Sequence, residues 1–373
     1  MSSRIKGFDG VRAIAVLLVF FQHKAGFGPG HLGVWMFFVL SGFLIAGILA
    51  KQRLSIESGA SRYMRELSYF MFRRTIRIFP VYYLVLGFLS ICVLIGFLGQ
   101  EYRAGLPYHF AYLSNIWIGQ IKQEWEGPFS HFWSLAIEEQ FYLLFAPLLL
   151  ATHVRRHWQI CVIFILAGLS SLWFSKSAGA REILIYTHPL TNFWLFALGG
   201  LGYHLTGYGV ASGRINMMHS FIPTAAAAAI IVLYASESSW KNGPGVYILA
   251  QACYGLCIAV LVCWIAGNRH SLLVSLLETR WLAALGRISY GFYLYHALVP
   301  SLTTGTRARM LFGDMGLSAW IYIVDVPLNF FITVILSWLS WRLIEKPILR
   351  LKERASTMET MQRHKIDALN SQA

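Results

Sequence analysis

Charged residues are scarce in this 373-residue chain: Asp, Glu, Lys and Arg make up 13% of it, and hydrophobic residues make up 57%. Soluble globular domains ordinarily carry about 25% charged residues. The scarcity therefore excludes an ordinary soluble domain. The mean hydropathy of +0.55 indicates a polytopic membrane protein instead.

The chain also lacks the patterns of several common sites. Its five cysteines all lie in apolar runs and show no CxxC or Cys/His spacing, so we expect neither a disulfide framework nor a zinc site. No metal site of another kind is expected. The serine of "VLSGF", Ser41, lacks the GxSxG elbow of a nucleophile and reads as a small helix-packing residue. No cleavage site follows the first apolar run, which we expect to stay as a membrane span.

Long apolar runs are what the sequence does have, and a membrane-spanning helix takes about 20 such residues. We predict an all-α polytopic membrane protein with about ten transmembrane helices. The runs lie near residues 10–27, 32–50, 78–99, 132–151, 158–174, 183–205, 220–236, 245–267, 281–303 and 317–341. We assign 1–346 to one transmembrane domain and 347–373 to a polar cytosolic tail, because Pro347 disfavours continuation of the last helix.

The distribution of the 31 lysines and arginines sets the expected orientation. Most of them fall in alternate loops, notably 51–77 and 342–373, if both termini are cytosolic. This arrangement explains most of the net charge of +14. Nucleic-acid binding, the other common reading of a basic chain, is therefore not expected.

Arg12 and His23 are unusual residues for the first apolar run. Eleven residues of α-helix are about three turns, so the two share a face with a rise of ~16 Å between them. Asp9 is one turn before Arg12 and can pair with it. One reading makes Arg12 a cytosolic anchor and His23 an interfacial residue. The other makes His23 a neutral base that lines a cavity.

The fourth span, "SHFWSLAIEEQFYLL", carries a polar face. His131, Ser134, Glu138 and Tyr142 are spaced at three or four residues and fall on one side of a helix. A carboxylate so close to hydrocarbon requires solvation or a partner. The face fits a functional cavity, although acidic residues at a helix start near the membrane interface would give the same pattern.

Two further groups carry the same ambiguity. Arg73, Arg74 and Arg77 of "FRRTIRIFP" suit bidentate binding of phosphate groups, and they suit the positive-inside rule equally. Tyr293 and His296 of "SYGFYLYH" are three residues apart on a helix. Such residues are more often interhelical hydrogen-bonding groups than catalysts.

Six segments in this order resemble acyltransferase family 3, the membrane-bound acyltransferases of bacterial polysaccharides, nodulation factors and macrolides. They are "FDGVRAIAVLLVFFQH", "HLGVWMFFVLSGFLI", "FRRTIRIFPVYYL", "HFWSLAIEEQFYLL", "GRISYGFYLYH" and "WRLIEKP". The resemblance covers almost the whole chain and implies the stand-alone form of the family. It implies about ten membrane helices in a bacterial cytoplasmic (inner) membrane. It also implies transfer of an acyl group from cytosolic acyl-CoA to a hydroxyl of a sugar-containing acceptor.

The resemblance also implies roles for individual residues. His23 would be the catalytic histidine and Arg12 its partner in the Arg-x10-His motif. Arg74 and Arg77 match the Arg-x-x-Arg pair implicated in acyl-CoA handling, and Glu138 matches the glutamate of the "WSLxxE" segment. Arg73 and Ser134 join the expected acyl-CoA site. His131, Tyr142, Tyr293 and His296 are expected to line the cavity or contact the acceptor.

The sequence departs from the family pattern at two positions. Trp35 stands in the second span where a small acidic or polar residue is expected. Asn192 stands where many members carry an arginine. We assign both residues to acceptor recognition.

The expected reaction needs no bound cofactor, and acyl-CoA, acetyl-CoA by family frequency, is the co-substrate. His23 would deprotonate an acceptor hydroxyl that attacks the thioester, and a covalent acyl-histidine route stays open. The expected partners are the bilayer and a glycan or glycolipid acceptor; no pattern sets an oligomeric state. A transporter or flippase of a lipid-linked sugar is the alternative class, although no internal repeat typical of transporters is evident. A scaffold would leave these polar faces without a role.

Overall fold

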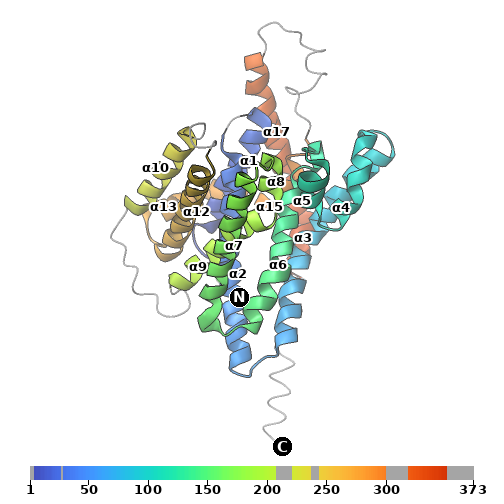
Figure 1. Cartoon of the computed structure of the whole chain (residues 1–373). Coiled ribbons are helices and arrows are strands. Elements are labelled where there is room, and N and C mark those ends of the chain that lie inside the picture. The colour runs from blue at the N-terminus through green and yellow to red at the C-terminus, as the bar shows by residue number, and fades with distance from the viewer. Residues whose placement is uncertain (1–3, 27, 207–220, 237–242, 300–317, 351–373) are drawn as a thin grey trace, which may run out of the picture.

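The structure is a computed structural model, and it describes residues 4–26, 28–206, 221–236, 243–299 and 318–350, with side chains from residue 324 in the last range. Throughout these ranges the chain is helical and contains no strand. The expected all-α class is therefore confirmed for the described chain, and the long helices run side by side (Figure 1).

Nine helices of 15 or more residues form the body of the bundle. They are α1 (Phe8–Ala25), α2 (Gly30–Glu57), α3 (Tyr63–Leu94), α6 (Phe132–Ala151), α7 (His157–Ser177), α9 (Leu190–Leu205), α10 (Phe221–Ala235), α12 (Pro244–Gly267) and α17 (Ser318–Ser340). The shorter helices are α4 (Leu106–Phe110), α5 (Ser114–Ile116), α8 (Glu182–Thr187), α13 (Leu272–Leu277), α14 (Arg280–Arg287) and α15 (Ser289–Tyr295). Some of these short helices, such as α8, lie within an expected apolar run, and others, such as α4, lie in a connection between two runs.

Six helical segments of the described chain are long and apolar enough to cross a membrane, as expected of a multi-pass membrane protein. They are Gly30–Glu57, Tyr63–Leu94, Gly127–Ala151, Val154–Ser177, Pro244–Gly267 and Val324–Arg350. The first expected span, α1, is 18 residues long and carries three charged residues, Asp9, Arg12 and Lys24. α9 and α10 have 16 and 15 residues, which is short for a bilayer crossing. The count of ten spans stays a prediction.

Two expected spans are broken helices. The run 183–205 consists of α8 and α9, with His188 extended between them at a ψ of 136°. Pro189 explains this break, because its ring excludes the preceding residue from the helical region. Within the run 281–303, α14 and α15 meet at Ile288 and α15 ends at Tyr295; residues 300–303 lie outside the described residues.

The expected helix end at Pro347 is wrong. Helical conformation continues from α17 through a wide turn at Trp341–Glu345 and on to Arg350. A π-type turn shifts the hydrogen-bond register just before the proline, which is one of the recognised ways to accommodate proline in a helix. The rest of the expected tail, 351–373, lies outside the described residues.

Residues 100–130, which hold α4 and α5, form a lobe at the side of the bundle opposite α10 and α12 (Figure 1). Its centre is a buried polar network. The two ring nitrogens of His109 contact Ser114 Oγ at 2.8 Å and Glu126 Oε2 at 3.0 Å. Tyr82 Oη of α3 donates to the His109 carbonyl at 2.7 Å. The network pairs these buried groups, with Glu126 Oε1 facing Lys122 Nζ at 3.6 Å, and it holds the lobe against α3, at the start of α6.

Glycines bring α2 and α9 into backbone contact. A Cβ atom built on Gly42 would lie 1.9 Å from the Phe196 carbonyl oxygen, and one on Gly199 would lie 1.9 Å from the Val39 carbonyl oxygen. These distances are far below van der Waals contact, so neither position has room for a side chain. Small residues at such crossings let membrane helices approach closely. The expected packing role of this segment of α2 is confirmed at Gly42.

We expect Gly42→Ala to lower stability by about 1–3 kcal/mol, because α2 and α9 must separate to admit the methyl group. The matched control is Gly87→Ala in α3, where a Cβ meets no atom within 4 Å. Alanine is the better helix former at such an open position, so this control should keep or raise stability. Thermal unfolding of both variants in the same detergent tests the expectation. Equal midpoints would contradict it.

Candidate functional site

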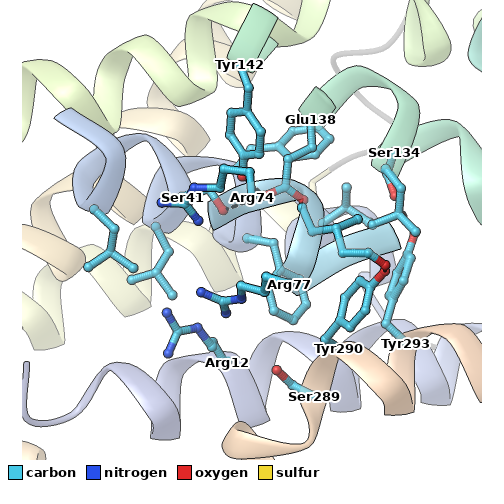
Figure 2. Close-up of a pocket in the computed structure, with 17 residues that line it drawn as sticks. Arg12, Ser41, Arg74, Arg77, Ser134, Glu138, Tyr142, Ser289, Tyr290 and Tyr293 are labelled. Carbon is cyan, nitrogen blue, oxygen red and sulfur yellow. Dashed lines mark hydrogen bonds between the residues drawn. The ribbon is translucent and has the colours of Figure 1, made fainter. Parts of the chain in front are cut away.

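A cavity of about 90 Å³ lies between α1, α2, α3, α6 and α15 (Figure 2). Its wall is polar on two sides and apolar elsewhere. The lining residues are Arg12, Val34, Phe37, Phe38, Leu40, Ser41, Leu44, Arg74, Arg77, Ile78, Ser134, Leu135, Glu138, Tyr142, Ser289, Tyr290 and Tyr293. We call it the inner cavity.

A second cavity of about 260 Å³ adjoins the inner cavity, and we call it the vestibule. Its lining is strongly basic: Arg4, Ile5, Phe8, Asp9, Arg12, Leu44, Ile48, Phe70, Arg73, Arg74 and Arg77. Arg12, Leu44, Arg74 and Arg77 line both cavities. Three arginines therefore stand where the vestibule meets the inner cavity.

Asp9 neutralises the arginines at the start of α1. Arg12 Nη1 lies 2.8 Å from Asp9 Oδ1, which confirms the pairing expected from their spacing. The other carboxylate oxygen, Asp9 Oδ2, lies 2.8 Å from Arg4 Nε. Arg4 also reaches Glu278 Oε2 at 2.9 Å, and the Gly7 amide donates to Glu278 Oε1 at 2.7 Å. These contacts fix the end of α1 that carries Arg12.

The carboxylates that act on Arg74 and Arg77 do so from beyond ion-pair distance: Glu138 and Glu139 on Arg74, and Glu345 on Arg77. Within the described residues, no carboxylate lies within ion-pair distance of either guanidinium group. The Arg74 guanidinium instead lies over the rings of Phe70 and Tyr142, 5.4 and 5.3 Å from their centroids. Cation–π contacts orient a cation without cancelling its charge. The junction of the two cavities is therefore suited to an anion.

Glu138 is held by hydroxyl groups rather than by an ion pair. Its Oε1 accepts a hydrogen bond from Ser41 Oγ at 3.0 Å and another from Tyr142 Oη. This satisfies the carboxylate whose position near hydrocarbon required a partner. The sequence suggested only a packing role for Ser41. The structure shows that Ser41 also orients the Glu138 carboxylate in the cavity.

Hydroxyl groups line the end of the inner cavity away from the arginines (Figure 2). Ser134 Oγ and Tyr293 Oη are 2.6 Å apart, and Tyr293 Oη also lies 3.1 Å from the His131 carbonyl oxygen. Tyr290 Oη donates to the Ile78 carbonyl at 2.6 Å. The hydrogen bond between Ser134 and Tyr293 closes this end of the cavity.

Three histidines lie beyond that closure. The rings of His131 and His296 lie 5.8 and 5.6 Å from the Tyr293 ring, and 5.7 Å from each other. The centroid of the His23 ring lies 5.1 Å from that of His296, and the two rings are nearly parallel. His131 and His296 are buried, and His23 is exposed. His23 lines neither cavity, so a layer of rings separates it from the inner cavity.

The structure thus brings together many of the residues singled out in the sequence. The inner cavity gathers Arg12, Arg74, Arg77, Ser134, Glu138, Tyr142 and Tyr293. Arg73 lines the vestibule but not the inner cavity, and its guanidinium lies over the Tyr69 ring. Within the described ranges, no three His, Cys, Asp or Glu side chains converge closely enough to hold a metal ion.

Trp35 and Asn192 lie outside both cavities. Trp35 packs edge-on against Trp194 and Tyr254. Asn192 Nδ2 donates to the carbonyls of Tyr186 and His188, both at 2.9 Å, and so satisfies the break between α8 and α9. The cavities of the described chain therefore give neither residue a place in acceptor binding, and that assignment stays a prediction.

Two residues that matter in the site, Ser41 and Arg4, were not expected there from the sequence. Ser41 has the pattern of a packing residue and lines the inner cavity, whereas Tyr290 is readable as a polar residue of the same span as Tyr293. Arg4 precedes the first helix and carried no signal, because its role depends on Glu278, which lies 274 residues away in the sequence.

Comparison with known proteins gives one family match, in which residues 5–342 match the model described as an acyltransferase domain. A Staphylococcus aureus (strain COL) protein named as an O-acetyltransferase is 28% identical over 92% of this chain and 57% of its own length. YrhL of Bacillus subtilis (strain 168), named as a peptidoglycan O-acetyltransferase, is 29% identical over 92% of this chain and 55% of its own. BcsY of Komagataeibacter xylinus, named as a membrane-bound transacylase, is 28% identical over 79% of this chain and 72% of its own.

This chain therefore spans little more than half the length of the first two relatives. No solved structure matches it. The family match extends over almost the whole chain, from the helix that carries Arg12 and His23 to the end of α17, and the chain belongs to acyltransferase family 3.

Proposed function

We propose that this protein transfers a short acyl group, acetyl in the first instance, from cytosolic acyl-CoA to a hydroxyl of a cell-envelope or secreted glycan. Exopolysaccharide, O-antigen and lipo-oligosaccharide are acceptors of this class. The observation that carries the proposal is the pair of adjoining cavities with Arg12, Arg74 and Arg77 at their junction. The names of the relatives, which include a peptidoglycan O-acetyltransferase, favour the same class of acceptor.

The vestibule suits the phosphates of coenzyme A. Arg74 and Arg77 carry charge that no carboxylate of the described chain neutralises at short range, and guanidinium groups bind phosphate by paired hydrogen bonds. A pantetheine arm that starts there can carry the thioester past the arginines into the inner cavity. The small volume of that cavity, about 90 Å³, favours a short acyl group over a long chain.

Ser134 and Tyr293 suit the reacting end of the donor. Their hydroxyl groups close the far end of the inner cavity, and each can donate to the oxygen of a tetrahedral intermediate when it leaves its present acceptor. His23 is the proposed general base. Its Nε2 takes the proton of the acceptor hydroxyl, the new C–O bond forms, the C–S bond breaks, and the thiolate takes that proton from His23 to leave as coenzyme A. Transfer therefore requires the ring layer between Tyr293 and His23 to open.

The proposal places ten passes in a bacterial cytoplasmic membrane with both termini in the cytosol. The connection after α2 and the connection between α6 and α7 lie together: the Val154 amide donates to Glu57 Oε1 and Arg53 Nη1 to the Leu150 carbonyl, both at 2.8 Å. Both connections are basic, which supports a cytosolic position for this end of the bundle. The lobe of residues 100–130 follows the other end of α3 (Figure 1).

Free-thiol release from acetyl-CoA by purified protein in nanodiscs tests the enzyme class. We expect slow turnover by the wild type, and loss of about 10²-fold or more in His23→Ala, because the general base is removed. His270→Ala is the matched control, since this histidine is exposed in the link between α12 and α13. Turnover that survives in His23→Ala would remove His23 from the chemistry. Absence of turnover in the wild type with glycan acceptors supplied would favour the transporter.

Arg77→Gln should weaken the binding of acetyl-CoA and leave the rate of the chemical step almost unchanged. We expect the KM for acetyl-CoA to rise about tenfold or more, since a charge-assisted hydrogen bond to phosphate contributes about 1.5–3 kcal/mol. The KM for acetyl-pantetheine, which lacks the phosphates, should hardly change. Arg155→Gln removes the same charge from an exposed site in the connection between α6 and α7 and serves as control. Equal effects on both donors would contradict a phosphate contact.

A further inference from the structure

Among the described residues, His23 has one hydrogen-bond partner, His296 at the end of α15. His23 Nδ1 lies 2.8 Å from His296 Nε2, and the two rings are nearly parallel, with an interplanar angle of 18°. The other nitrogen of His296, Nδ1, lies 2.6 Å from the Tyr293 carbonyl oxygen. The three groups form a chain that runs from backbone carbonyl to His296 to His23.

The carbonyl at one end of this chain fixes the positions of the protons. A carbonyl oxygen only accepts, so His296 Nδ1 carries a hydrogen and donates it to Tyr293. A neutral imidazole has one donor and one acceptor, so His296 Nε2 is an acceptor. His23 Nδ1 must then be the donor. The remaining nitrogen, His23 Nε2, is left with a free lone pair.

The surroundings keep His296 neutral, as this assignment needs. The residue is 1% exposed, and burial in an apolar setting disfavours the charged form. Lys24 and His131 face it, and a positive charge on Lys24 acts in the same direction. On α17, the negative charge of Asp325 acts on Lys24. Lys24 is further held by a hydrogen bond to the Val299 carbonyl at 2.5 Å.

We infer that His296 is a positioning residue that holds His23 in the tautomer needed by a general base. The inference rests on the proposed function for the role of His23, but the tautomer itself follows from the contacts of His296. When Nε2 takes the acceptor's proton, His23 becomes an imidazolium whose Nδ1–H bond to His296 strengthens, because hydrogen bonds from charged donors are stronger. His296 thereby favours the charged state that the reaction creates, and no buried carboxylate is required.

Two substitutions distinguish the contribution of the hydrogen-bond acceptor of His296 from that of its aromatic ring. His296→Gln keeps an oxygen that can accept from His23 Nδ1, whereas His296→Phe keeps an aromatic ring at this position and removes the acceptor. We expect His296→Phe to lower kcat on the order of 10²-fold, with the KM for acetyl-CoA changed by less than about twofold. His296→Gln should recover at least about a tenth of wild-type kcat. Equal losses in both variants, or a loss confined to KM, would overturn the positioning role.

The tautomer has a readout that does not depend on turnover. Solid-state ¹⁵N NMR of histidine-labelled protein in nanodiscs reports which ring nitrogen carries hydrogen, and His23→Ala identifies the signals of His23 among the 12 histidines. We expect the Nδ1–H form in the wild type and in His296→Gln, and a shift to the Nε2–H form in His296→Phe. An Nε2–H form of His23 in the wild type would overturn the inference. The expected spectra with no acetyl transfer would instead contradict only the proposed function.

Discussion

Positive charge inside a bundle of apolar helices is the constraint on which this site depends, because each cation there needs a partner, water or a ligand. The three arginines at the junction of the cavities differ in how closely a negative charge approaches them. Arg12 has the carboxylate of Asp9, and Arg74 has the faces of two aromatic rings with Glu138 and Glu139 beyond ion-pair distance. Arg77 has Glu345, also beyond ion-pair distance. Charge compensation thus decreases from the start of α1 to the junction of the cavities, which is where an anionic donor would supply the missing partner.

The same constraint explains why the site is assembled from distant segments. Glu138 of α6 would be a liability alone, and its oxygen is satisfied by Ser41 of α2 and by Tyr142 of its own helix. Ser134 meets Tyr293 of α15 across 159 positions of sequence. Close helix packing makes these contacts possible, as where Gly42 of α2 lets α9 reach backbone contact. Polar residues of the cavity and small residues of the crossings are therefore parts of one arrangement.

Local features of this arrangement could be predicted from the sequence, because they depend on helical spacing alone. The pairing of Asp9 with Arg12 and the shared face of Ser134, Glu138 and Tyr142 are of this kind. The break at Pro189 is also readable locally, because a proline disfavours helical conformation at the residue before it. The contact between His23 and His296 was not readable, because it joins residues 273 positions apart through the packing of α15 on α1. Nor could helical spacing show that a ring layer separates His23 from the cavity.

A histidine in the position of His296 suits the interior of a membrane protein better than a carboxylate would. A carboxylate could orient His23 by the same hydrogen bond, but it would bring a full negative charge into a place where His296 is 1% exposed. Neutral imidazole accepts the bond without that cost, and the Tyr293 carbonyl determines which of its nitrogens does so. The backbone at the end of α15 thus sets the direction of the chain of hydrogen bonds. Orientation of the proposed base is thereby tied to the same residue, Tyr293, that closes the donor cavity.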